Sequence, residues 1–278
     1  MKAFAEFKEM SMEFWSLVKL VSEALGYKDR RTGNVLAYET EDIEQVFRRF
    51  DMPLDHSVIK DVRDYSVRRA ATLNRYVKNS LMDAQEAYHI FECLYNTYSD
   101  YELLCKIPKN KQSGEMKRIN YFTAIINILT EITIRKQYFY DGSLGFDDDP
   151  QGLVCVFDSD NRIVGTSSRR FDGAYPQIFN PQIVWEIKEY YYTTTFGSRI
   201  ADGVYETQLD GYEFADIERR TNRKVYHVFF VDGYTTWWKM GTSYLCRIID
   251  MLNAGLVDEV IFGREVFERW PIFLEEHI

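Results

Sequence analysis

Cysteine and histidine are scarce in this chain of 278 residues, which contains four of each. No two cysteines form a C-x-x-C pair, and the four are widely separated (Cys93, Cys105, Cys155 and Cys246). Neither a zinc site nor a disulfide framework is therefore expected. The sequence also has no run of about 18 apolar residues, so it predicts no membrane span. Because the N-terminus lacks the long apolar core of a signal peptide, we expect a reducing, cytoplasmic setting.

Basic residues are fewer than acidic ones. The chain has 34 lysines and arginines and 43 aspartates and glutamates, so its net charge is −9. This balance argues against a protein that coats nucleic acid through its bulk charge. It leaves room for an enzyme with a local basic cleft, because a metal site itself concentrates carboxylates. Hydrophobic residues at 46% are ordinary for a folded chain, and the length suits one large domain or two small ones.

The first part of the chain has the apolar spacing of helices throughout. Helices are predicted over residues 1–26, from 40 to about 50, and over 57–104 as one long helix or two joined ones. The segment Pro108–Gly114 has the composition of a linker. We therefore predict a helical region over residues 1–107, a linker over 108–114 and a second domain over 115–278.

The second part of the chain mixes helices and strands. The predicted order is helix, β-hairpin, strand, helix, strand, helix and strand, at 115–137, 153–165, 183–188, 198–220, 226–231, 243–253 and 257–262. The turn of the hairpin, Asp158–Asn161, is rich in residues that favour turns. This alternation of elements predicts an α/β fold.

A buried-type strand at 183–188 carries two charged residues, Glu186 and Lys188. Residues two apart on a strand point to the same face, so the two side chains should lie side by side. Burying a charge is costly unless it is paired or binds a metal. One interpretation is an ion pair near the end of the strand, and the other is a functional site.

Asp172, thirteen intervening residues and then Glu186-Ile187-Lys188 resemble the motif of the PD-(D/E)XK nuclease superfamily. Phe171 stands where the name of the motif has proline. The order of helix, three strands, helix and strand from residue 115 is similar to the core of that superfamily. The resemblance implies a restriction-endonuclease-like α/β core, in which a mixed central sheet is flanked by helices, here preceded by an all-helical N-terminal region.

The resemblance implies an endodeoxyribonuclease that hydrolyses double-stranded DNA, most like a type II restriction endonuclease. Its cofactor would be Mg²⁺, with Mn²⁺ able to take its place. Asp172, Glu186 and the backbone carbonyl of Ile187 would be the metal ligands. Lys188 would orient or activate water, or stabilise developing charge. By analogy with enzymes that cut both strands of a palindrome, a homodimer is expected.

Several neighbouring side chains are candidates for binding the substrate. Arg169 and Arg170 could grip a phosphate, or they could be the solvated start of a strand. Tyr191 and Thr193 lie in an aromatic and threonine-rich segment that could reach the DNA backbone, or that could simply extend the strand.

Further candidates lie close to the predicted site or on the preceding helix. Residues expected near the mouth of the site are Glu189, Arg199, Asp202 and Glu206. Glu131 could approach the metal as an accessory acid, as the resemblance implies, or it could be an exposed helical glutamate. A basic segment on the earlier helices (Arg63, Arg68, Arg69, Arg75 and Lys78) is either a phosphate-contacting face or a solvated helix surface.

Two other functions remain open from the residues. One keeps the same chemistry in a phage-defence or repair nuclease with little sequence specificity. The other is a non-catalytic binding protein on a degenerate nuclease fold, which the acidic balance and the helical half would suit.

Overall fold

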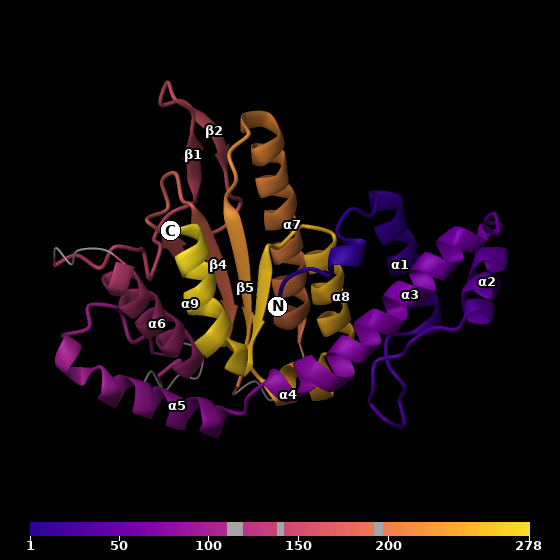
Figure 1. Ribbon diagram of the computed structural model, residues 1–278, viewed down its shortest axis with the longest axis horizontal. Coiled ribbons are helices and arrows are strands. Elements are labelled where there is room, and N and C mark those ends of the chain that lie inside the picture. Colours follow the sequence, from indigo (N-terminus) through magenta and orange to yellow (C-terminus); the bar gives the residue numbers. More distant parts are fainter. Residues whose placement is uncertain (110–118, 138–141, 192–196) are drawn as a thin grey trace.

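A mixed four-stranded sheet forms the centre of the molecule (Figure 1). The computed structural model describes residues 1–109, 119–137, 142–191 and 197–278. The strand order is β3-β4-β5-β6; β3 is antiparallel to β4, whereas β4, β5 and β6 are parallel. The strands are β3 Gly173–Tyr175, β4 Ile183–Lys188, β5 Tyr226–Val231 and β6 Glu259–Phe262. The predicted α/β class and mixed central sheet are confirmed.

The hairpin predicted near residue 160 is present but does not belong to the central sheet. Strands β1 (Cys155–Phe157) and β2 (Ile163–Thr166) form a separate two-stranded sheet, and Cys155 of β1 also makes an isolated bridge to Phe179. The expectation that they supply two strands of the core sheet was therefore wrong. The hairpin packs instead against helix α7. Gly165 of β2 lies so close to Ile217 of α7 that a Cβ on residue 165 would clash with the Ile217 side chain.

The antiparallel strand of the central sheet is β3, a segment for which the sequence predicted no strand. Its first residue, Gly173, pairs with Trp185 of β4, and a Cβ there would lie 2.0 Å from the Trp185 ring. Only glycine fits this contact, and glycine is depleted in strands. The tight packing that creates β3 thus also hides it from a propensity-based prediction.

Two pairs of helices cover the faces of the sheet. Helices α7 (Ser198–Thr221) and α8 (Thr242–Asn253) lie on one face, and α6 (Tyr121–Gln137) and α9 (Val266–His277) lie on the other (Figure 1). Alternate residues of β5 divide between the two cores: Phe229 packs with α7 and α8, whereas Phe230 packs with α6 and α9. The central strands are thus covered on both sides, as parallel strands require.

Helix α9 was not predicted from the sequence, which gave no element beyond residue 262. Its Trp270 is completely buried, with its ring centre 5.3 Å from that of Trp185 and 5.0 Å from that of Phe230. The indole N–H donates to the hydroxyl of Thr130 on α6 (2.8 Å). Pro271, next to it, breaks the helical pattern that a sequence-based prediction relies on.

The described part of residues 1–107 is built from helices, as predicted. They are α1 Met12–Leu25, α2 Thr40–Arg49, α3 His56–Thr72, α4 Lys78–Ser80 and α5 Ala84–Thr97. The same region contains the 3-10 turns η1 Ala5–Phe7 and η3 Ser99–Tyr101 and the π-helical segment η2 Leu73–Val77. Two further short segments lie later in the chain, the π-helical η4 Tyr234–Met240 and the 3-10 turn η5 Gly263–Glu265. The predicted linker falls mostly on residues 110–118, outside the described residues.

The long helix predicted over 57–104 is interrupted before α5. Met82 exchanges backbone hydrogen bonds with Asp232 (3.2 Å) and Tyr234 (2.8 Å), just beyond β5. Asp83 then begins α5 by accepting hydrogen bonds from the backbone N–H groups of Gln85 and Glu86, both at 2.9 Å. The interruption therefore anchors the helical region to the segment that follows the interior strand β5.

The helical region is also joined to α8 by a buried arginine. Arg69 is fully buried and donates to both carboxylate oxygens of Asp250 (3.0 and 2.9 Å) and to the hydroxyl of Ser22 (3.0 Å). Neither interpretation of the basic segment fits this residue, because it contacts no solvent. Among the described residues, no helix has the length and apolar composition needed to cross a bilayer.

Candidate active site

Strand β4 places Glu186 and Lys188 side by side, as the two-residue period predicts. Both are almost completely buried, at 5% and 7% exposure. The Lys188 amine donates a short hydrogen bond to Oε1 of Glu186. It also lies 3.9 Å from Oε2 of Glu206 on α7. The ion pair is common to both interpretations of the strand, so the surroundings of the pair have to distinguish them.

Asp172 joins this pair from the neighbouring strand. It lies immediately before β3, where its backbone N–H donates to the carbonyl of Trp185 (3.1 Å). Its Oδ2 accepts a hydrogen bond from the backbone N–H of Ile187 (2.7 Å). The antiparallel pairing therefore holds the Asp172 carboxylate against the backbone between Glu186 and Lys188.

The two carboxylates respond differently to their burial. Loss of solvation and then repulsion from Glu186 raise the pKa of Asp172 to about 7. Burial would also raise the pKa of Glu186, but Lys188 and Arg169 reverse the effect and hold it below its usual value. Burial opposes the charge of Lys188, yet its carboxylate partner raises the pKa of the amine. Without a metal ion, Asp172 is thus the carboxylate of the site whose negative charge the neighbouring cations compensate least.

Arg169 connects the site to α7. Its guanidinium contacts Oε2 of Glu186 (2.9 Å) and donates twice to Oδ2 of Asp210 (3.0 and 2.6 Å). The Arg169 guanidinium is thus engaged within the protein. Neither predicted role, gripping a phosphate or forming the solvated start of a strand, describes these contacts. Arg170 is exposed, so it is the one of the two arginines that a ligand could reach.

The catalytic candidates open onto a cleft of about 630 Å³. The cleft is lined by Lys106, Ile107, Pro108, Lys109, Asn120, Thr123, Asp148, Asp149, Phe171, Asp172, Glu186, Ile187, Lys188, Glu189 and Tyr190. Lys106 and Lys109 line this cleft together with Asp148 and Asp149, whereas the sequence assigned Lys109 only to the predicted linker. The structure thus brings Asp172, Glu186, Ile187 and Lys188 together at one concave surface.

Glu189, expected near the mouth, has a structural role. Its carboxylate accepts hydrogen bonds from the backbone N–H groups of Phe122 (3.2 Å) and Thr123 (3.0 Å) and from the Thr123 hydroxyl (2.8 Å). These donors form the N-terminus of α6, where a carboxylate is favourable. Burial raises the pKa of Glu189 to about 7, against the effect of these hydrogen bonds. The residue fixes α6 at the end of β4.

Other predicted candidates lie away from the cleft or beyond the description. Glu131 does not line the cleft and is completely buried, so the interpretation as an exposed glutamate was wrong. Its carboxylate accepts the N–H groups of Leu104 (3.0 Å) and Cys105 (2.9 Å). Tyr191 packs its ring against Phe122 in the core beside α6 and is not part of the cleft wall. Thr193 lies outside the described residues.

The remaining mouth candidates come from the start of α7. The side chain of Arg199 lies outside what the structure describes. Asp202 and Glu206 are on the first turns of the helix, and Glu206 is the one placed near the Lys188 amine.

The donor set fits a Mg²⁺ ion that keeps several of its waters. Asp172 and Glu186 supply two carboxylates to the cleft, and their repulsion is the kind that a cation relieves. Within the described residues there is no group of three or more acidic, histidine or cysteine side chains that could hold an ion alone. Glu186 would also have to exchange part of its contact with Lys188 or Arg169 for the ion.

Asp172→Asn is expected to stabilise the metal-free protein at alkaline pH. Because folding raises the pKa of Asp172 from 3.8 to about 7, its contribution to stability is complete below pH 4 and is lost as the pH rises through 7. The amide keeps an acceptor for the Ile187 N–H but carries no charge. Thermal unfolding in EDTA should show a gain of about 1 to 3 kcal/mol at pH 8 and none near pH 4.

Asp160→Asn, in the exposed hairpin turn, is the matched control and should show no such pH dependence. If Asp172→Asn has the same stability as the unmodified chain at pH 8, burial and the neighbouring Glu186 do not disfavour the charged form of Asp172 as described.

Two family models match the chain, one on each side of the short helix α4. Residues 1–76 match the model described as "Domain of unknown function (DUF7690)", and residues 82–277 match the one described as "Domain of unknown function (DUF7687)". No curated protein and no solved structure matches the chain. The second model covers the sheet, its four covering helices and the cleft. The chain therefore belongs to the family described as "Domain of unknown function (DUF7687)".

Proposed function

We propose that the chain is a Mg²⁺-dependent endodeoxyribonuclease that hydrolyses phosphodiester bonds of double-stranded DNA. The observation that carries the proposal is the meeting of Asp172, Glu186 and Lys188, from two adjacent strands, at one wall of a cleft of about 630 Å³. An isolated ion pair between Glu186 and Lys188 requires neither the second carboxylate nor the cleft. The combination is what metal-assisted phosphodiester hydrolysis needs.

Each residue has a role that follows from its surroundings. Asp172, Glu186 and the carbonyl of Ile187 would hold the metal ion. When bound, Mg²⁺ neutralises charge on phosphoryl oxygens and lowers the pKa of a bound water. Lys188 has a raised pKa and is therefore charged, which supports charge stabilisation or orientation of water over proton abstraction. Arg169 keeps Glu186 ionised and fixed while α7 holds Arg169 in turn.

The proposed substrate is an anion, whereas the cleft is lined by Asp148, Asp149, Asp172, Glu186 and Glu189 beside three lysines, so the proposal relies on bound Mg²⁺ to offset negative charge there. Lys106 and Lys109 lie on its wall, and Lys106 is paired with Asp149 (2.9 Å). The finer proposal, a type II site-specific restriction endonuclease acting as a homodimer, is supported by the resemblance of the motif. A digest of DNA of known sequence distinguishes it from a phage-defence or repair nuclease with low specificity, because only the former yields discrete bands.

A second candidate is a non-catalytic binding protein on the same fold. Two observations favour it: both oxygens of Glu186 are already held by cations, Lys188 and Arg169, and no larger metal-binding group exists in the described part of the chain. On this account the contacts of Glu186 with Lys188 and Arg169 would only connect β4 to α7.

Duplex affinity with and without a divalent ion tests the proposal. Without metal, Asp172 and Glu186 should repel the DNA backbone, so affinity should rise when Ca²⁺ is added in place of EDTA. The double variant Asp172→Asn with Glu186→Gln should bind duplex without needing the ion. All three affinities must be measured at one salt concentration, because phosphate contacts depend strongly on salt. Equal affinities in all three conditions would contradict a metal site at these carboxylates.

A further inference from the structure

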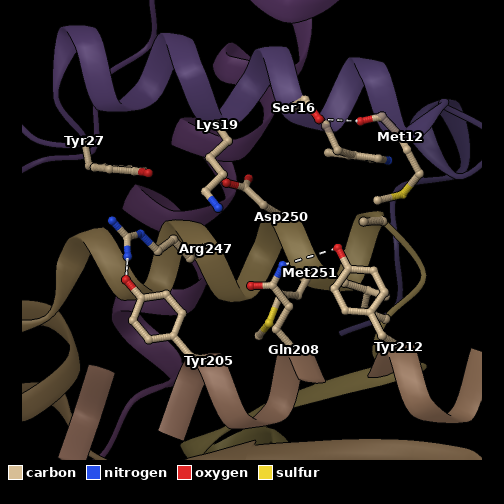
Figure 2. A pocket seen from close by; sticks show the side chains of 13 residues that line it. Met12, Ser16, Lys19, Tyr27, Tyr205, Gln208, Tyr212, Arg247, Asp250 and Met251 are labelled. Atoms are coloured by element: carbon tan, nitrogen blue, oxygen red, sulfur yellow. Dashed lines mark hydrogen bonds between the residues drawn. The ribbon is translucent and has the colours of Figure 1, made fainter. Parts of the chain in front are cut away.

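A second cavity, of about 160 Å³, lies between helices α1, α7 and α8 (Figure 2). It is on the other side of α7 from the cleft. Tyr205, Gln208 and Tyr212 of α7 line the cavity, whereas Glu206 and Asp210 of the same helix contact Lys188 and Arg169. The cavity is therefore separate from the candidate active site, and it is built jointly by the two segments that the family models match.

Aromatic rings form much of the cavity's wall. Trp15 of α1 and Tyr27, just after the end of α1, are buried. Tyr205 and Tyr212 of α7 are 47% and 43% exposed. The only hydrogen bond described for the Tyr212 hydroxyl is a long one from Gln208 (3.5 Å). Large aromatic side chains that remain half-exposed around a concavity offer faces for another ring to stack on.

The charges around the cavity leave an excess of one positive charge. Arg247 lies over the rings of Tyr27 (5.5 Å) and Tyr205 (5.6 Å) and pairs with Glu23 (2.5 Å). Its Nε is buried and has no hydrogen-bond partner. Asp250, whose carboxylate lies beside Lys19 in Figure 2, is neutralised by the buried Arg69 described above.

Lys19 supplies the remaining charge. It points from α1 into the cavity (Figure 2), and no ion pair joins it to another described residue. The neighbouring Asp250 is already engaged by Arg69 and by the hydroxyl of Tyr65 (2.6 Å). A ligand with a negative group at the mouth would thus meet an unpaired ammonium, and its ring would meet the aromatic wall.

We propose that this cavity binds a planar aromatic anion, with about one aromatic ring inside the cavity and the charged part of the anion at its mouth. The size follows from the volume, since a protein cavity of about 150 Å³ accommodates a benzene ring. The ring requirement follows from the four aromatic residues, and the negative charge from Lys19, since Arg247 is already paired with Glu23.

The test is calorimetric titration of the full chain, in EDTA, with AMP and with indole-3-acetate. Adenosine supplies a ring without charge, and inorganic phosphate supplies charge without a ring. At least one of the two anions should bind, and phosphate should not. If AMP is the one that binds, adenosine should bind about fivefold or more weakly than AMP.

Two variants should weaken binding for different reasons. Lys19→Gln should cost the bound anion about fivefold in affinity without changing how an uncharged ring binds. Tyr212→Ala, at a half-exposed position, should cost about fivefold or more through lost stacking. Lys8→Gln, an exposed position outside the cavity, makes the same charge change and should leave affinity unchanged.

Glu186→Gln separates this site from the cleft, because it alters the cleft alone and should also leave the anion's affinity unchanged. The proposal is overturned if neither anion binds, if Lys19→Gln and Tyr212→Ala bind as the unmodified chain does, or if Glu186→Gln changes the affinity. None of these results bears on whether the cleft cuts DNA, so the two proposals fail independently.

Discussion

Glu186→Gln is expected to reduce Mg²⁺-dependent cleavage of duplex DNA by at least about a thousandfold. The substitution keeps the shape of the side chain and removes the one carboxylate of the site that its surroundings keep ionised. Without that charge, the metal would retain a single carboxylate ligand, Asp172. The measurement is the single-turnover cleavage rate of a labelled duplex at saturating protein and a fixed Mg²⁺ concentration.

Loss of the fold has to be separated from loss of the reaction. Lys188 and Arg169 would lose their shared partner, but Arg169 keeps its two hydrogen bonds to Asp210 and Lys188 remains close to Glu206. Circular dichroism should therefore show a folded variant, somewhat less stable than the unmodified chain. Glu268→Gln, exposed on α9, controls for the loss of one carboxylate elsewhere. Full activity of a folded Glu186→Gln variant would remove Glu186 from the mechanism.

Lys188→Ala is expected to slow cleavage of bound DNA by about a hundredfold or more, the usual effect of losing a positioned charge stabiliser or proton-transfer group. The Lys188 amine is almost buried and is held by Glu186, so it should contribute more to the transition state than to the initial binding of DNA. Affinity for the duplex in Ca²⁺ should therefore change little. The rate and the affinity are measured separately, by single-turnover cleavage and by titration.

Lys106→Ala is the matched comparison, because Lys106 is exposed on the cleft wall and pairs with Asp149 rather than with Asp172 or Glu186. It should weaken binding and leave the rate on bound DNA nearly unchanged. The reverse pattern in Lys188→Ala, with lost affinity and a preserved rate, would make Lys188 a simple phosphate contact.

The strand that carries the site could be predicted from local pattern alone. A run of β-branched and aromatic residues around Glu186 and Lys188 indicates a covered strand, and the two-residue period fixes which side chains share a face. The structure has β4 at Ile183–Lys188 with all six residues buried. Asp172, which the motif resemblance grouped with Glu186 and Lys188, lies beside this strand because β3 pairs with β4 in the antiparallel sense.

What local pattern could not give are the contacts made across long stretches of sequence. Arg169 donates to Asp210, forty-one residues further along the chain, and the sequence around the two residues does not predict this contact. Glu131 is spaced as an exposed residue would be, yet it is buried because two backbone N–H groups of a distant loop need an acceptor. Burial and partnership of polar groups are properties of the tertiary fold, and they decide here which candidates are free to act.

Incubation of supercoiled plasmid with the full chain tests the central claim most directly. Reactions with Mg²⁺, with Ca²⁺ and with EDTA are compared, beside the Glu186→Gln variant in Mg²⁺. Nicked or linear plasmid should form only with the unmodified chain in Mg²⁺. Plasmid that stays supercoiled in every reaction, or cleavage that continues in EDTA or in Glu186→Gln, would contradict a metal-dependent nuclease site at Asp172, Glu186 and Lys188.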